Sequence, residues 1–478
     1  MTSAEIGMVV EGATGPSLPS GIREGVVSRA DGNPLFAEAL VTVIAERGPD
    51  TIDTFRVPET VEALVAARLD ALPHSLRSLV LDAAVVGVSI RAEALASMSG
   101  LGPGAVKEGV KDLFRREFLR PAGGGEHEFW HGLVQEVAYR QIPRAVRSAK
   151  HRAFAEWLEV RGSEEATDLL AHHFGRALDL AVEARESKEI RQHLAEQSFA
   201  YRVLAAGKAL RGADPGGAAT LLVSAAEALG EILAPDLGLV GEAGGLLVTL
   251  GRWSDAIDLL TPFATSARPA ILRALGVAMC KLNREDPDSE DYRNGQAYLE
   301  RAAAHGDGDA LASLAGTWKG IDESKVRELY RRASEIDPAD PYPLGNLLEY
   351  EVQAAGDTSS LQGLRGRISA AIDRCRQQAA GGKNLPWAYY DLGKFSLLLG
   401  RPYEGLEAYA KAVDLSPASF MVETSLASLH RLSGVTKRVP GLAWARDLLA
   451  LAHDDHAVRD AHDRLHHMLH DQDGHAVV

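Results

Sequence analysis

The chain has 478 residues, of which 46% are hydrophobic and 24% charged, so it is too long for one ordinary core and too apolar for general disorder. Its formal net charge of -15 disfavours nucleic acid and anionic membranes as partners, because both repel a negative chain. With only two cysteines and no run of about 18 apolar residues, we expect no disulfide framework, no membrane span and a cytoplasmic protein.

The N-terminal region predicts a short leader followed by two helices. Glycine, proline and small residues are frequent over residues 1–17, which we interpret as a flexible leader. One helix is expected from Ile22 to Ala30, and a second begins at Pro34, because proline suits the first position of a helix. These helices make up a predicted helical segment over residues 18–50.

The turn between these helices carries a motif. It reads G-N-P-[LF]-[FY]-x-E-x-L and is matched by Gly32, Asn33, Pro34, Leu35, Phe36, Glu38 and Leu40. It resembles the end of the helical lid in signal-transducing (STAND) NTPases of the AAA-related superfamily, where the turn lies beside adenine. No phosphate-binding loop G-x-x-x-x-G-K-[ST] occurs, so the resemblance implies a nucleotide site at Gly32, Asn33 and Pro34 only if another chain completes it. The simpler interpretation is a helix-capping turn that packs.

Residues 51–160 predict a winged-helix domain. The expected elements, in order, are helices beginning at Pro58 and Pro73, helices over 91–99 and 103–117, and strands over Phe118–Arg120 and His127–Trp130. The last of these helices would enter a DNA groove, but its basic residues are interspersed with acidic ones: Lys107, Lys111, Arg115 and Arg116 against Glu108, Asp112 and Glu117. Because DNA affinity depends largely on unopposed positive charge, DNA binding is the weaker interpretation.

The end of this domain and the helix after it also resemble a known arrangement. The pattern is that of the segment following the ATPase core in large bacterial regulators of the ATPase-cyclase or LuxR-type kind. It is matched by Phe129, His131, Leu133, Val137, Ala138, Tyr139, Pro143, Arg144, His151 and Trp157. With the lid motif, the resemblance covers about residues 18 to 180. It implies the C-terminal portion of such a regulator, lacking the P-loop core.

The connecting helix after the hairpin is basic. Its positive residues are Arg140, Arg144, Arg147, Lys150 and Arg152, whereas the following region is acidic, so we expect the two to dock. Packing by Phe154, Trp157 and Leu158 should supply most of the stability of this junction.

Residues 161–452 predict an array of helical pairs. Its clearest unit is Leu385–Pro417, in which the small and large residues Leu392, Gly393, Gly400, Gly405, Tyr409, Ala412 and Pro417 follow a fixed spacing. That spacing resembles the tetratricopeptide repeat (TPR), and one such hairpin cannot bury both faces without neighbours. We therefore expect a TPR-like α-solenoid. Its groove would be lined by the first helices of the pairs, with Asn346, Tyr350, Tyr390 and Lys394 as candidate partner-binding residues.

Residues 453–478 form a histidine-rich tail. His462, His466 and His470 are spaced i, i+4 and i+8 along one helical face, a pattern that can hold a divalent metal. The alternative is a solvated helix surface with an ordinary apolar stripe.

Taken together, the sequence predicts a mainly α protein: lid-remnant helices and a winged helix followed by the solenoid. We expect no enzyme activity and no cofactor, and a scaffold that binds a protein partner in the TPR groove. A second hypothesis is the regulatory half of a nucleotide-switched ATPase whose P-loop core lies on another chain. A third is a DNA-binding regulator.

Overall fold

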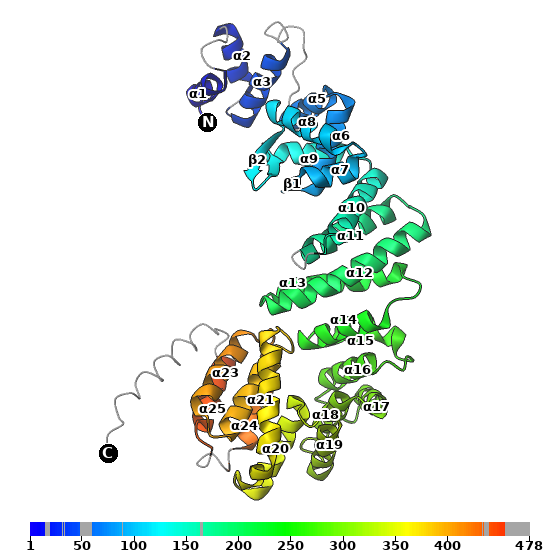
Figure 1. Cartoon of the computed structure of the whole chain (residues 1–478), viewed down its shortest axis with the longest axis vertical. Coiled ribbons are helices and arrows are strands. Elements are labelled where there is room, and N and C mark those ends of the chain that lie inside the picture. The colour runs from blue at the N-terminus through cyan, green and yellow to red at the C-terminus, as the bar shows by residue number, and fades with distance from the viewer. Residues whose placement is uncertain are drawn as a thin grey trace, which may run out of the picture. The chain divides into compact units, whose positions relative to one another are not determined.

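The chain is mainly α-helical, which confirms the predicted fold class (Figure 1). A computed structural model describes residues 1–14, 20–30, 32, 34–47, 60–87, 89–162, 166–432, 434 and 439–454. These residues form two compact units, Met1–Ser198 and Phe199–Val478. None of the helices in the described ranges combines the length and apolar composition that a membrane crossing needs.

The first unit begins with three packed helices, α1 (Ser3–Thr14), α2 (Ser20–Ala30) and α3 (Pro34–Arg47). The prediction of a flexible leader is therefore wrong over α1. Thr2 and Glu5 cap this helix reciprocally: the Thr2 N–H donates to Glu5 Oε2 (2.7 Å) and the Glu5 N–H donates to Thr2 Oγ1 (3.3 Å). Ile6 and Val10, one helical turn apart, are buried in the core that α1 shares with α3. Helical periodicity thus outweighs the local glycine content.

A small sheet and its surrounding helices follow. The elements are α5 (Val61–Asp70), α6 (His74–Val86), β1 (Ile90–Arg91), α7 (Ala92–Ser99), α8 (Pro103–Arg115), β2 (Leu119–Gly123), β3 (Glu126–Phe129) and α9 (Gly132–Gln141). The antiparallel sheet has the order β1-β3-β2. Strand β1 was not predicted, because two residues have no periodicity of their own. Gly109 on α8 lets α6 approach, since a Cβ there would overlap Leu79. The winged-helix assignment of this segment stays a prediction.

Helices α10 (Arg144–Glu159) and α11 (Thr167–Glu183) pack on each other, and α10 also contacts α6 and α7. The boundary predicted at residue 160 therefore falls inside the first unit. Phe154 is buried as expected, and one of the basic residues makes the predicted kind of contact while another does not. Arg144 reaches Glu183 of α11 (3.1 Å), whereas Lys150 pairs with the buried Asp82 of α6. One of these ion pairs therefore joins α10 to α11 and the other joins α10 to α6.

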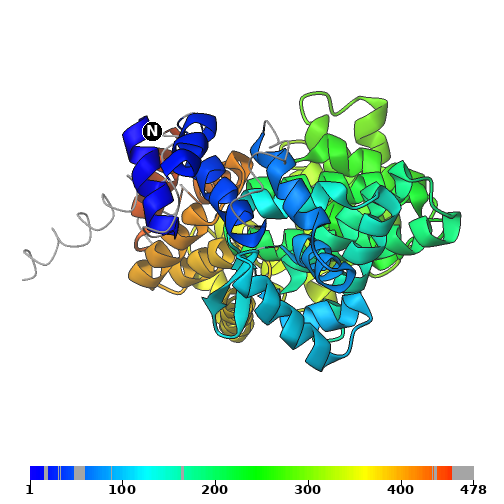
Figure 2. The ribbon, with the colours of Figure 1, turned by 90° about the horizontal axis from the view of Figure 1, so that it is seen from above.

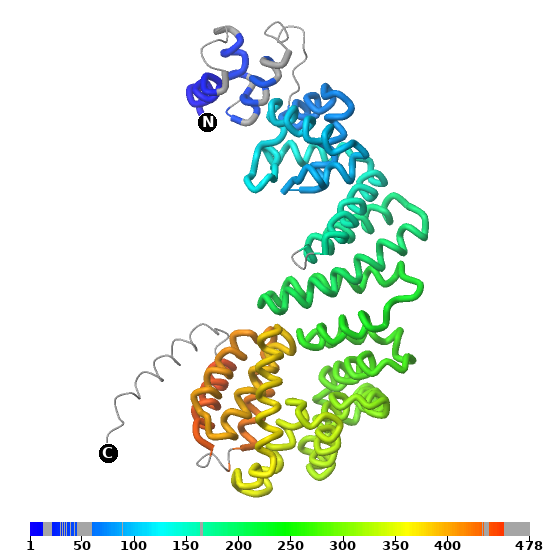
Figure 3. The backbone as a smooth tube through the Cα atoms, viewed as in Figure 1, coloured from blue at the N-terminus to red at the C-terminus, as the bar shows by residue number. Residues whose placement is uncertain are grey.

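The second unit is an α-solenoid of helical pairs joined by short turns (Figure 3). Helix α12 (Lys188–Arg211) spans the boundary between the units. The helices that follow are α13 (Pro215–Ala228), α14 (Leu237–Thr249), α15 (Trp253–Leu260), α16 (Pro269–Leu282), α17 (Glu290–Ala304), α18 (Gly308–Thr317), α19 (Glu323–Ile336), α20 (Pro341–Ala355), α21 (Arg365–Ala380), α22 (Trp387–Leu398), α23 (Pro402–Asp414), α24 (Ser419–Arg431) and α25 (Leu442–Asp454). Short 3-10 turns lie at Leu229–Glu231, Thr261–Phe263 and Ser359–Leu364.

Many of these helices begin at a side-chain cap. The capping residues, whose oxygens accept backbone N–H groups of the first turn, are Asp214, Asp236, Ser289, Asp307, Asp322 and Asp340. Such caps fix where each helix starts and so set the register between neighbouring pairs.

The pair α22 and α23 shows why the repeat needs its small residues. A Cβ on Gly393 would lie 2.8 Å from the Tyr409 ring, and one on Gly405 would lie 2.9 Å from Leu397 Cγ. The connecting Gly400 has φ +76, a conformation that glycine adopts without strain. The motif spacing therefore describes a close approach of two helices.

Early and late helices of the second unit, coloured green and orange in Figures 1 and 2, also contact each other through side chains. The Trp253 ring at the start of α15 lies 5.6 Å from the Phe420 ring of α24. Arg284, just after α16, lies 3.9 Å from Glu423 of α24. The array of the second unit therefore curves back on itself and surrounds a partly open space.

Candidate partner-binding cavity

This space is a partly open cavity of about 490 Å³ inside the second unit. Its walls come mainly from the first helices of successive pairs, α14, α16, α18, α20, α22 and α24. A cavity of this size is in the range that holds a small ligand or one to a few residues of a peptide.

One wall of the cavity is aromatic. The Trp387 ring lies 5.7 Å from Tyr390 and 6.3 Å from Phe420, measured between centroids. Tyr390 is held in place because its hydroxyl shares a 2.8 Å hydrogen bond with Ser416 Oγ. These rings offer flat apolar surface, which binding sites use because few rotamers are lost on contact.

Three of the four predicted groove residues line this cavity. They are Asn346 on α20 and Tyr390 and Lys394 on α22, and their part in binding stays a prediction. The structure corrects the placement of Tyr350, which is buried in a neighbouring core with its ring 6.1 Å from Tyr330. Tyr350 lies one turn after Asn346, and the packing of α19 on α20 covers that turn.

Behind the cavity lies a buried charge cluster that the sequence reasoning missed. The fully buried Glu349 of α20 accepts from Lys394 Nζ (2.6 Å), from Ser428 Oγ, and from Arg431 Nε and Nη2 (2.9 and 2.6 Å). Burial opposes the ionisation of Glu349, but the charges of Lys394, Arg431 and Lys319 outweigh it and lower its pKa to about 2. The one available signal was the position of Glu349 in residues 347–352, where it and Glu351 stand among four apolar or aromatic residues.

Lys319 extends this cluster towards Asn346. Its Nζ donates to Asn346 Oδ1 (2.9 Å) and lies 5.2 Å from the centroid of the Tyr330 ring. Burial, assisted by the positive charge of Arg431, lowers the pKa of Lys319 to about 7. The side chain of Asn346 is thus oriented by a lysine whose ammonium group loses its proton near neutral pH.

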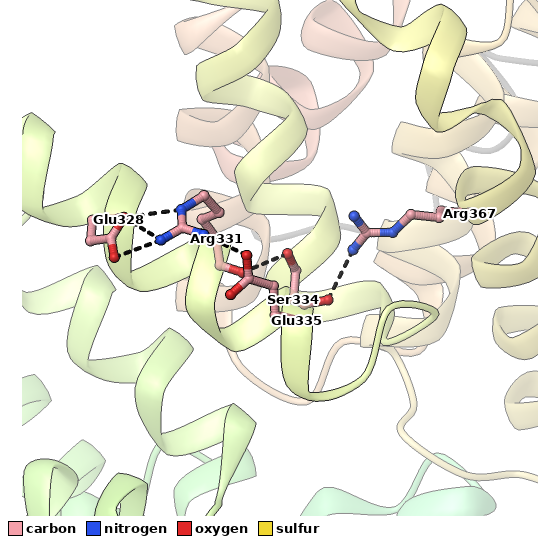
Figure 4. Close-up of polar contacts among 5 residues, drawn as sticks. All are labelled: Glu328, Arg331, Ser334, Glu335 and Arg367. Atoms are coloured by element: carbon pink, nitrogen blue, oxygen red, sulfur yellow. Dashed lines mark hydrogen bonds and ion pairs between the residues drawn. The ribbon is translucent and has the colours of Figure 1, made fainter.

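The outer surface of the array carries a different kind of ion pair. Arg331 on α19 bonds Glu328 Oε1 (2.8 Å) and Glu335 Oε1 (2.5 Å), and Arg367 Nη2 donates to the Ser334 carbonyl (2.9 Å) (Figure 4). Arg331, Glu328 and Glu335 are all about half exposed, so water screens their interaction. These exposed ion pairs can be compared with the buried ion pairs of Glu349.

The glycine of the predicted nucleotide turn contacts Met1. The Gly32 carbonyl accepts the N-terminal amine of Met1 (3.0 Å), and a Cβ on Gly32 would lie 2.7 Å from the Met1 carbonyl oxygen. Pro34 begins α3, and Asn33 lies outside the described residues. The described contacts fit the packing interpretation of this turn.

The first unit contains a buried histidine pair beside a second cavity of about 890 Å³. His151 Nδ1 lies 2.8 Å from His173 Nδ1, and Tyr139 Oη lies 2.8 Å from His151 Nε2. Burial and then the neighbouring histidine charges lower the pKa of His151 to about 2, and the same causes lower that of His173 to about 3. Neither ring is therefore charged near neutral pH.

No described group of histidine, cysteine or acidic side chains has the arrangement of a metal site. The metal prediction for His462, His466 and His470 concerns residues outside the described ranges, so it stays a prediction.

Comparison with known proteins gives a sparse result. No family profile matches the chain, and no curated protein matches it. Among solved structures, it is similar to a STAND protein with a tetratricopeptide repeat sensor from Pyrococcus horikoshii, at 13% identity and a TM-score of 0.46. That match covers 99% of this chain and 72% of the other. A likeness this distant carries no argument about function, which has to come from the cavity.

Proposed function

We propose that the chain is a non-catalytic regulatory scaffold whose TPR-like solenoid binds a segment of a protein partner. The observation that carries this proposal is the cavity, because it is built from the first helices of the pairs and walled by Trp387, Tyr390 and Phe420. A partner side chain entering it would bury apolar surface against rings that are already fixed. A cytoplasmic location is part of the proposal.

The chemistry of the described residues supports a binding role over a catalytic one. Burial raises the pKa of Cys280 to about 12 and that of Cys375 higher still, so neither thiol is activated as a nucleophile. Lys394 and Arg431 are both bonded to Glu349, which leaves them poorly placed to stabilise a developing charge on a substrate.

The test compares three baits in affinity capture from the native host. Wild-type chain should retain a partner that the double variant Trp387→Ala, Phe420→Ala loses, because the aromatic wall is removed. The control is Tyr403→Ala, an exposed aromatic residue on α23 outside the cavity, and it should retain the same partner. Circular dichroism establishes that all baits are folded. Equal capture by the three baits would refute a binding role for the cavity.

The alternative hypotheses have less support from the described contacts. The ATPase half needs Gly32, Asn33 and Pro34 to be completed by a phosphate-binding loop on another chain, because none occurs in this sequence. Titration with labelled ATP, with and without a co-purified P-loop protein, tests that reading. For DNA, Lys111 and Arg115 of α8 pair with Glu108 and Asp112, which reduces unopposed positive charge. Tight binding to duplex DNA that weakens steeply with added salt would support the DNA-binding hypothesis.

A further inference from the structure

The cavity of the second unit holds a buried carboxylate without a counter-charge of its own. Asp391 on α22 lines the cavity and is 8% exposed. It forms no hydrogen bond or ion pair with any other residue in the described part of the chain. Buried carboxylates are normally paired, because transfer of an isolated charge from water is costly.

The nearest cation does not serve Asp391. Lys394, one turn further along α22, directs its ammonium to Glu349 at 2.6 Å and lies too far from Asp391 to form an ion pair. Arg431, the other cation of the buried cluster, also bonds Glu349. Both cations therefore bond Glu349, and Lys394 acts on Asp391 only through space, without an ion pair.

Other acidic groups make this part of the cavity more negative. Asp340, the N-cap of α20, acts on Asp391 with a like charge, and so does Glu349. Burial raises the pKa of Asp391 to about 6; Lys394 opposes this shift, while Asp340 and Glu349 add to it. Asp309 of α18 also lines the cavity, but it is paired with Arg273 at 2.8 Å.

The aromatic wall adjoins the same carboxylate. Trp387 and Tyr390 precede Asp391 on α22, and all three line the cavity. A carboxylate beside aromatic faces suits an organic cation, because the anion pairs with the charged head and the rings hold the alkyl stem and attract the cation.

We propose that the cavity is a binding site for a primary ammonium group on an alkyl chain, with Asp391 as its counter-ion. Two sources share this chemistry, the lysine side chain of a partner segment and a free diamine. A lysine side chain as the ligand rests on the proposed function, the binding of a protein partner in this cavity. A free diamine as the ligand does not depend on it.

Lys281 is a positively charged residue in the same cavity, and its charge would repel a cationic ligand. It lines the cavity from α16, with its ammonium 5.7 Å from the Phe420 ring. Burial lowers its pKa, the Arg284 charge adds to this, and the Glu423 carboxylate opposes it. The charges acting on Lys281 include the Glu423 carboxylate, whereas those acting on Asp391 include two further carboxylates, Asp340 and Glu349, so a ligand cation is favoured at Asp391.

The experiment measures binding to the full chain by isothermal titration calorimetry at neutral pH. The probes are the blocked tripeptides acetyl-Gly-Lys-Gly-amide, its norleucine analogue and its glutamate analogue, together with free 1,5-diaminopentane. The lysine peptide should bind more tightly than the norleucine and glutamate peptides. If the diamine binds and the lysine peptide does not, the ammonium site is supported and its ligand is a free amine. In that case a lysine side chain of a partner protein is rejected as the ligand.

Two variants make the test specific. Asp391→Asn keeps the size of the side chain and removes an uncompensated buried charge, so it should fold, and it should weaken binding of the cationic probe about tenfold or more. Lys281→Met removes a like charge from the same cavity and should leave that affinity equal or higher. The proposal is overturned if no cationic probe binds, if norleucine binds as well as lysine, or if Asp391→Asn has no effect.

Discussion

Removal of the Glu349 carboxylate is the perturbation whose size follows most directly from the structure. Glu349→Gln preserves the shape of the side chain and leaves Lys394 and Arg431 buried near a neutral group. The pKa of Glu349 is lowered from 4.5 to about 2, and each pKa unit corresponds to about 1.4 kcal/mol, so the carboxylate contributes about 3 kcal/mol to folding. Loss of one partner from a buried pair typically costs about 3–5 kcal/mol, which agrees with this estimate.

The pH dependence has a definite sign. Because the pKa of Glu349 is lower in the folded chain, its contribution is fully present above pH 4.5 and is lost as the pH falls towards about 2. The difference between wild type and Glu349→Gln should therefore be large at pH 7 and should shrink through this range.

The assay is hydrogen exchange read by mass spectrometry on peptides from α20, α22 and α24, because a repeat array can open locally before it unfolds as a whole. The matched control is Glu328→Gln, which removes an exposed partner of Arg331 and should produce no measurable change. In the Glu349→Gln background, Lys394→Met should cost less than it does in wild type. Equal protection in the two glutamine variants at pH 7 would refute the reasoning.

The other predictions concern packing and protonation. Gly393→Ala should destabilise the second unit by about 1–3 kcal/mol in urea unfolding, because the new methyl group meets the Tyr409 ring, whereas Gly366→Ala, in open space on α21, should be neutral or stabilising. Tyr409→Ala should cost about 2–5 kcal/mol, and a loss below that range would show that the site is not core. His151 and His173 have lowered pKa values, so the unfolded chain takes up their protons first; stability should fall below pH 6.5 by about 1.4 kcal/mol per pH unit for each ring. His151→Gln should reduce the slope by about 1.4 kcal/mol per pH unit in urea titrations at several pH values, and an unchanged slope would contradict the assignment.

Local sequence was enough to predict most of the helices and the repeat. The pairing of Gly393 with Tyr409 lies within one hairpin, so the spacing of small and large residues already specifies which helix faces meet. A proline likewise located the start of α3, at Pro34. Helix α1 was not predicted. Its glycines suggested a flexible segment, and the helical spacing of the two buried residues Ile6 and Val10 was too short a pattern to indicate a helix.

The cavity and its charges were decided by tertiary structure. Glu349 bonds Arg431, which lies 82 residues later in the chain. The Trp253 ring contacts the Phe420 ring, which brings early and late helices of the array together. Helical periodicity indicates which face of each helix is apolar, but the curvature of the array depends on many small rotations between successive pairs. Whether a charged residue on an inner face is bonded, as Lys394 is, or left without a partner, as Asp391 is among the described residues, depends on that accumulated curvature.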